Sequence, residues 1–299
     1  LQSCLDLAGD DPQANIVILQ PGTYSNGPYI YNPPVGDNGG ALVIQNESST
    51  LPVIDGGNSN SCLDVVNTGL ADDLGADITV TGLIFQNCFG GRGAGLEVRT
   101  DQSNIIVENS NFFDNSAVDD DGGGANLSTT SGNTIVRNCI FERNNSAGPA
   151  GGLEASSYSG DISLLDNTFN DNETGNIGGA AYIYSNGGDF LVDNNLISGN
   201  RSGTSGGGLS LSSDGSENVT IVNNIFSGNS NGNRAGSSGT SGGGLALEDI
   251  GSNIIVTNNT FFGNTAQADD NVADGGGLAL YSYGDTNLDI YNNIIFGNS

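Results

Sequence analysis

The sequence predicts an all-β protein folded as a single-stranded parallel β-helix, a solenoid in which each turn of chain adds short strands to stacked sheets. Three features predict this fold: a motif ending in Asn that returns about every 28 residues, a Gly-Gly motif between its copies, and β-branched runs that follow the Gly-Gly motif. Each short apolar segment is bounded by Gly, Asn, Asp or Ser, which is typical of strands joined by tight turns. Outside the first dozen residues, no helical periodicity lasts beyond a turn or two.

The first motif places an apolar residue three positions before a small polar one, in eight successive copies. The apolar position is occupied by Phe85, Phe112, Phe141, Phe169, Ile197, Phe226, Phe261 and Ile295. The second position is Cys88 in the first copy and then Asn115, Asn144, Asn172, Asn200, Asn229, Asn264 and Asn298. Stacked copies predict an internal aromatic ladder and a ladder of Asn amides, in which each amide bonds the copies above and below.

The second motif is clearest at Gly151-Gly152-Leu153, Gly207-Gly208-Leu209 and Gly243-Gly244-Leu245. We expect its glycines to let the chain turn a corner with positive φ. Longer connections at 230–242 and 265–275 stretch the repeat towards the end of the chain. They are either a binding face or tolerated surface insertions.

The repeat also predicts the domain organisation. We expect one β-helix domain over residues 1–299, with an amino-terminal cap and first strand in 1–27 and irregular first turns in 28–76. Regular repeats of about 28–35 residues would then fill 77–299, which gives about nine or ten turns.

Composition excludes several classes of function. There are 34 acidic and six basic residues, a net charge of −28, and no His. A chain without His has no Ser-His-Asp machinery and no histidine-ligated metal. The charge argues against a nucleic-acid partner, and no apolar run is long enough to insert into a membrane. The acidity fits either a salt-rich medium or an exterior that only needs to be polar.

The paired Gly-Gly-Leu and Phe-x-x-Asn motifs resemble the repeats of polymorphic outer-membrane proteins and related bacterial and archaeal surface proteins. The resemblance covers about residues 75–299 well and the first 74 loosely. It implies a right-handed parallel β-helix, secreted to the outside of the cell or to its surface, with a structural or adhesive role. It also implies surface glycans or a neighbouring cell surface as partners. Cys88, where later copies have Asn, departs from the pattern.

The alternative is a carbohydrate-active enzyme, because parallel β-helices also house polysaccharide lyases and hydrolases. A lyase of that sort uses an Arg or Lys base beside carboxylate-bound Ca²⁺, and all the basic residues here are Arg. They are Arg92, Arg99, Arg137, Arg143, Arg201 and Arg234. None lies in a recognisable acid-rich motif, so the sequence predicts no catalytic residues and no enzyme.

Two acidic clusters are candidate calcium sites. Asp119, Asp120 and Asp121 precede one Gly-rich turn, and Asp269, Asp270 and Asp274 precede another. Paired carboxylates and turn carbonyls supply the oxygen ligands that Ca²⁺ prefers. The other interpretation is that both clusters are solvated acidic loops. Calcium is the one cofactor that the sequence raises.

The four cysteines lead to one hypothesis about a disulfide. Cys4 lies in the expected cap and Cys62 in a strand of the first turns, so a Cys4–Cys62 bridge would pin the cap. Cys88 and Cys139 lie on different ladders about two turns apart, farther than a disulfide spans. We expect both to be buried free thiols.

The last repeat of the sequence ends directly after Asn298, before a further Gly-Gly strand. An uncovered solenoid turn has unpaired backbone groups that can pair with another chain. The sequence therefore predicts self-association, head to tail, into an oligomer or filament.

Overall fold

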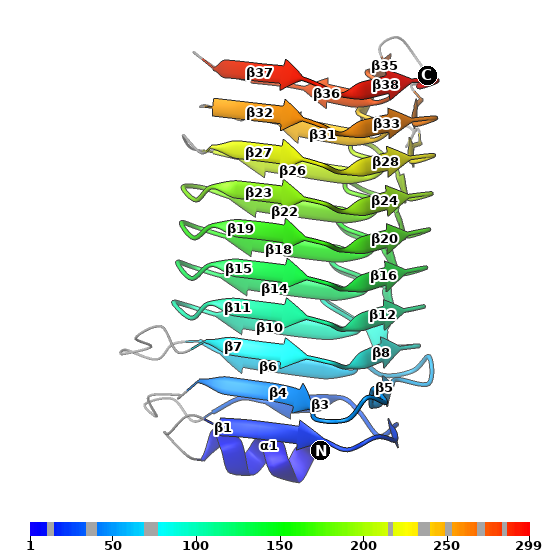
Figure 1. The fold of residues 1–299 in the computed structure, drawn as a ribbon. Coiled ribbons are helices and arrows are strands. Elements are labelled where there is room, and N and C mark those ends of the chain that lie inside the picture. The colour runs from blue at the N-terminus through cyan, green and yellow to red at the C-terminus, as the bar shows by residue number, and fades with distance from the viewer. Residues whose placement is uncertain are drawn as a thin grey trace.

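A computed structural model describes residues 1–10, 15–33, 41–68, 77–214, 218–232, 240–248, 253–267, 273–282 and 286–299. The side chains of residues 240, 241, 273 and 274 are outside this description. The described chain forms a rod of stacked coils with one short helix at its amino-terminal end (Figure 1). Every strand pair among the described residues is parallel, so the predicted parallel β-helix is confirmed.

Each regular coil visits four sheets in the order A, B, D and C. Among the described residues, sheets A and B contain ten strands each, sheet C nine and sheet D seven. Sheet A consists of β1 (Asn15–Leu19), β4 (Leu42–Asn46), β7 (Ile78–Thr81), β11 (Ile105–Glu108), β15 (Thr134–Arg137), β19 (Ile162–Leu165), β23 (Phe190–Asp193), β27 (Val219–Val222), β32 (Asn253–Thr257) and β37 (Asn287–Tyr291). Sheet B consists of β2 (Thr23–Tyr24), β5 (Val53–Asp55), β8 (Ile84–Gln86), β12 (Asn111–Phe113), β16 (Ile140–Glu142), β20 (Thr168–Asn170), β24 (Leu196–Ser198), β28 (Ile225–Ser227), β33 (Thr260–Phe262) and β38 (Ile294–Phe296).

The other two large sheets close each coil. Sheet C consists of β3 (Tyr29–Tyr31), β6 (Leu63–Asn67), β10 (Leu96–Thr100), β14 (Ala125–Thr129), β18 (Leu153–Ser157), β22 (Ala181–Ser185), β26 (Leu209–Ser213), β31 (Leu245–Glu248) and β36 (Leu278–Leu280). Sheet D consists of β9 (Phe89–Gly90), β13 (Ser116–Ala117), β17 (Asn145–Ser146), β21 (Glu173–Thr174), β25 (Arg201–Ser202), β29 (Ser230–Asn231) and β34 (Thr265–Ala266). In the two long connections, β30 (Thr240–Ser241) pairs with β35 (Ala273–Asp274).

The predicted aromatic ladder is confirmed. The apolar positions of the repeat are direct partners along sheet B, from Phe85 to Ile295. The rings of Phe112 and Phe141 stack with centroids 4.5 Å apart. These side chains point inwards and are fully buried from Phe85 to Phe261. Each coil thus contributes one large apolar group to a core that a single coil could not close.

The predicted Asn ladder is also confirmed, at the corner between sheets B and D. Asn172 Oδ1 accepts from the backbone N–H and the Nδ2 of Asn144, at 3.0 and 2.9 Å. Its own Nδ2 donates to the Phe141 carbonyl and to Asn200 Oδ1, both at 2.9 Å. A second buried ladder, not predicted, lies at the corner between sheets A and B. Its members are Asn167, Asn195, Asn224, Asn259 and Asn293.

The structure corrects the expected role of the paired glycines. Positive φ belongs to the residue before the pair, as at Gly206 and Gly242. The pair is small because neighbouring coils touch there: a Cβ on Gly152 would lie 2.5 Å from the Ala180 carbonyl oxygen. The backbones of neighbouring coils therefore approach so closely that a side chain on these glycines would clash.

The amino-terminal cap is the helix α1 (Gln2–Gly9). It covers the first coil (Figure 1). Its residues Leu5 and Ala8 are buried, while Leu7 is exposed. Within the described residues, no helix is both long and apolar enough to span a bilayer.

Candidate functional site

The outer face of sheet C carries a row of polar side chains, one from each of several successive coils. Strand register places Asp64, Glu97, Asn126, Glu154 and Tyr182 at equivalent positions, directly above one another. Neighbouring parallel strands are about 4.8 Å apart, so these groups interact although they are far apart in sequence. These five residues are termed the sheet C row.

The connections from sheet D to sheet C bring further charges to this row. Arg92 Nη2 lies 3.4 Å from Asp120 Oδ1 and 3.9 Å from Asp121 Oδ2. Asp121 extends towards the next coil, where Gly148 leaves room for its carboxyl group, since a Cβ at Gly148 would clash with Asp121 Oδ1. Two loops and one sheet face therefore converge at Arg92, Asp120, Asp121 and Glu154.

Glu154 is the most perturbed carboxyl group of the cluster. Burial, then the charge of Asp121 and a hydrogen bond with it, raise the pKa of Glu154 to about 8. Burial also raises the pKa of Asp121, with Asp120 adding to the effect. Because a hydrogen bond between two carboxyl groups needs a proton, this pair holds one at neutral pH. Asn126 Nδ2 donates to Glu154 Oε2 at 3.1 Å and fixes its orientation.

The lower part of the row is acidic as well. Burial and the nearby charge of Glu97 raise the pKa of Asp64 to about 6. Burial raises the pKa of Glu97, although Arg99 and Arg92 oppose the shift. Arg99 Nε lies 2.9 Å from Glu97 Oε1.

Tyrosines occupy the upper part of this face. Burial and the charge of Glu154 raise the pKa of Tyr182 to about 12, so its hydroxyl remains a donor. Tyr184, on the same strand, donates from its hydroxyl to Asp214 Oδ2 at 2.9 Å. The face thus changes from carboxylates to phenols along the rod.

The cluster has the groups for proton transfer but lacks two arrangements that carbohydrate-active enzymes use. Glycosidase carboxyl pairs stand at least about 5 Å apart, whereas Glu154 and Asp121 share a hydrogen bond. Burial alone would lower the pKa of Arg92, but Asp120, Asp121 and Glu154 outweigh it and raise the pKa, which keeps the guanidinium charged. A charged guanidinium is a poor base for a lyase reaction.

The other arginines that the sequence singled out are ion-paired with carboxylates. Arg137 pairs with Glu108 at 2.5 Å and Arg201 with Glu173 at 3.5 Å, each to the preceding coil. Arg143 pairs with Asp114 of the preceding coil at 2.8 Å. Arg234 lies outside the described residues. These pairs tie neighbouring coils together at the surface.

The candidate calcium residues are only partly described. Asp119 is exposed, while Asp120 and Asp121 bond Arg92 and Glu154 instead of standing free. Asp269 and Asp270 lie outside the described residues, and of Asp274 only the backbone in β35 is described. Within the described chain, no three acidic or cysteine side chains are grouped so that they could hold a metal ion. Calcium binding stays a prediction.

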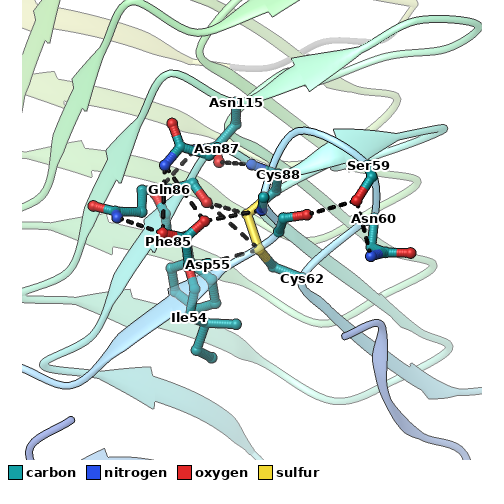
Figure 2. Close-up of a disulfide and its surroundings, with 12 residues drawn as sticks. Ile54, Asp55, Ser59, Asn60, Cys62, Phe85, Gln86, Asn87, Cys88 and Asn115 are labelled. Atoms are coloured by element: carbon teal, nitrogen blue, oxygen red, sulfur yellow. Dashed lines mark hydrogen bonds between the residues drawn. A yellow bond between two sulfur atoms is a disulfide. The ribbon is translucent and has the colours of Figure 1, made fainter. Parts of the chain in front are cut away.

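The expected Cys4–Cys62 disulfide is wrong. Cys62 pairs with Cys88, and their Cα atoms are 5.6 Å apart (Figure 2). Both residues are buried and lie in adjacent coils, and this Cα separation suits a disulfide. Cys4 is free and exposed on α1. The expectation of a free Cys88 is therefore also wrong, whereas Cys139 is a buried free thiol as expected.

The sheet C row itself does not emerge from the sequence. Its members differ in type from coil to coil, so they produce no repeat. A signal is present nonetheless: alignment of Gly95-Leu96-Glu97 with Gly152-Leu153-Glu154 puts two carboxylates at one position. The sequence points to Asp120 and Asp121, but as calcium ligands, not as partners of Arg92 and Glu154.

Comparison with known proteins agrees with the fold. A family model described as "right handed beta helix region" matches residues 38–226 and again residues 150–295. The chain belongs to this family, which confirms the right-handed parallel β-helix. No curated protein and no solved structure matches the chain significantly.

Proposed function

We propose that this chain is an extracellular structural or adhesive module that acts by presenting its outer faces. The observation that carries the proposal is the strand register, which stacks equivalent outward positions from coil to coil along the rod. Such a surface suits an extended partner, a surface glycan or a neighbouring cell surface, better than a small molecule.

Two further features support an extracellular location. The Cys62–Cys88 disulfide is typical of oxidising compartments. The net charge of −28 favours solubility and disfavours contact with nucleic acid or anionic lipid. The resemblance to bacterial and archaeal surface proteins points in the same direction.

The ion pairs support a role without chemistry. Each described arginine already neutralises a carboxylate, and Glu154 and Asp121 are hydrogen-bonded to each other. Groups engaged in this way stabilise the rod and its surface.

A carbohydrate-active enzyme is the second candidate, and one observation favours it. Glu154, with a pKa of about 8, is protonated at neutral pH, as a general acid must be. In that case the sheet C row would be the substrate cleft.

One experiment separates the two candidates. The purified chain is incubated with pectate and with neutral polysaccharides, and both bound protein and released product are measured. Product is read as new reducing ends and as the ultraviolet absorbance of unsaturated uronates. We expect retention on a polymer without product. Product that disappears in Glu154→Gln would establish the enzyme instead.

A further inference from the structure

The repeats lose their surface charge part of the way along sheet B. Segments 194–200, 223–229, 258–264 and 292–298 contain no Asp, Glu, Lys or Arg. The equivalent segments of the three preceding coils carry Asp114, Glu142, Arg143, Asp166 and Asp171. In a chain of net charge −28, four uncharged segments in successive coils form a distinct surface on sheet B, which is termed the neutral face.

Apolar side chains project from this face. Leu196, Ile225 and Phe262 are 39%, 46% and 47% exposed, although they lie on ordinary sheet B strands. The ring of Phe262 stacks on Phe296 of the next coil with centroids 4.5 Å apart. Leu196 and Ile225 are register partners in one column, and Phe262 and Phe296 are partners in the column two residues further along the strand. Together they form an apolar strip that shifts sideways between the coils of Ile225 and Phe262.

Polar but uncharged groups frame the strip. Ser198 and Ser227 are register partners beside it, and Asn194 and Asn223 stand at the corner with sheet A. At the corner with sheet D, Gly199, Gly228 and Gly263 take positive φ where earlier coils have Asp114, Arg143 and Asp171. At Gly228 and Gly263 a Cβ would meet nothing within 4 Å, so a flat partner can approach the strip closely there, whereas the carboxylate of Asp171 lies over Gly199. Asp193, on sheet A, accepts from Asn223 Nδ2 at 3.0 Å and borders the face.

Size and charge identify the partner. Four coils at about 4.8 Å and seven residues across give a face of about 400 Å². A stable protein interface buries about 800 Å² on each partner, so a second copy of this chain would be held too weakly. An anionic polymer would be repelled by the rest of the molecule, and a cationic one would prefer the acidic sheet C row.

We propose that the neutral face binds a neutral polysaccharide chain lying along the rod. Sugar rings have apolar C–H faces that pack on Leu196, Ile225 and Phe262, and hydroxyl edges that bond Ser and Asn side chains. The coil spacing is close to the length of one sugar residue in an extended chain, so successive coils meet successive sugars. This inference rests on the proposed adhesive function and names the face and the ligand class.

The test uses the whole chain and four insoluble or cross-linked neutral polysaccharides: amorphous cellulose, mannan, amylose and dextran. Phe262→Ser and Ile225→Thr use residues that occupy the same columns in neighbouring coils, at Ser227 and Thr260, so the strands accept them. We expect each variant to bind at least tenfold more weakly to the polymer that retains the wild type. Ser227→Asp, which adds a charge to the face, is expected to abolish retention.

Ile140→Thr is the matched control, because Ile140 occupies the column of Ile225 in the charged part of sheet B. It should bind like the wild type, and thermal denaturation should show all variants folded. The inference is overturned if none of the four polymers retains the wild type, or if Phe262→Ser and Ile225→Thr bind unchanged. Retention that instead disappears in Tyr182→Ser would also overturn it, yet leave the adhesive function in place. Release of product would contradict the adhesive function itself.

Discussion

At the corner between sheets B and D, buried Asn side chains hydrogen-bond each coil to the coils on either side. Asn172 makes four such bonds, two as acceptor from Asn144 and two as donor to Phe141 and Asn200. Its side chain is fully buried, so water cannot take over these bonds.

We therefore expect Asn172→Ala to lower the free energy of unfolding by about 2–4 kcal/mol, because it leaves the buried N–H of Asn144 unsatisfied. Urea denaturation followed by circular dichroism measures the change. Asn170→Ala is the control: this residue points outwards on β20, and its loss should cost less than about 1 kcal/mol. Equal costs at both positions would contradict the role of the ladder.

The proton held by Glu154 makes stability depend on pH. The pKa of Glu154 is about 8 in the folded chain against 4.5 for an ordinary glutamate side chain, so folding takes up a proton between these values. This contribution is fully present below about pH 4.5 and is lost as the pH rises to about 8. Asp64, whose pKa of about 6 is also raised, acts in the same direction.

The free energy of unfolding of the wild type should fall between pH 5 and pH 8 as Glu154 ionises. In Glu154→Gln this fall should be smaller by about 2–4 kcal/mol, since a neutral amide cannot ionise. Urea denaturation at a series of pH values measures this. Glu173→Gln, at an exposed position on β21, should show the same pH dependence of stability as the wild type. An unchanged slope in Glu154→Gln would mean that Glu154 is ionised at neutral pH.

At the scale of the elements, the sequence predicts what every coil repeats and misses what one coil does alone. The aromatic ladder and the Asn115–Asn298 ladder follow from a motif that recurs with fixed spacing. The sheet C row and the Cys62–Cys88 disulfide depend on which residues the register brings together, and a repeat period does not give that. The Asn167–Asn293 ladder escapes prediction because its Asn opens the same motif and reads as a turn residue.

The helix α1 covers the amino-terminal coil of the rod (Figure 1). It lies across the first coil, so head-to-tail pairing of strands between copies would first have to displace it (Figure 1). Head-to-tail assembly thus stays a prediction, and it requires α1 to move away from the first coil.

Leu5→Asp should loosen this cap, because Leu5 is 1% exposed in the interface with the first coil. We expect more end-to-end association than in the wild type, measured by light scattering and by the length of particles in electron micrographs. Leu7→Asp, at a position 73% exposed, should leave the particles unchanged. Identical behaviour of the two variants would show that α1 does not guard the end.

At the scale of the whole molecule, the net charge of −28 produces repulsion between carboxylates. With 34 acidic and six basic residues, carboxylates that bond no arginine repel one another along the rod. Raising the salt concentration from 0.01 to 0.15 M shortens the screening distance from about 30 to about 8 Å.

The midpoint of thermal unfolding should therefore rise by about 5 °C or more over this range of NaCl concentration. Differential scanning calorimetry measures it. At pH 4, where many carboxylates are protonated, the same addition of salt should have a smaller effect. An unfolding midpoint that does not change with NaCl concentration at pH 7 would show that the charges are too far apart to affect stability.

The direction of the inter-coil hydrogen bonds has a mechanical consequence. They run along the rod, as from Leu96 N to the Gly124 carbonyl, so a pull on the two ends loads them in line and releases one coil at a time. The Asn144 to Asn172 repeat is 28 residues, and each released coil would lengthen the chain by about 90–100 Å. The covalent link between Cys62 and Cys88, which are separated by 26 positions in the sequence, withholds the stretch between them from that extension. A tethered rod of this kind would yield in steps under load and stop short at its crosslinked end.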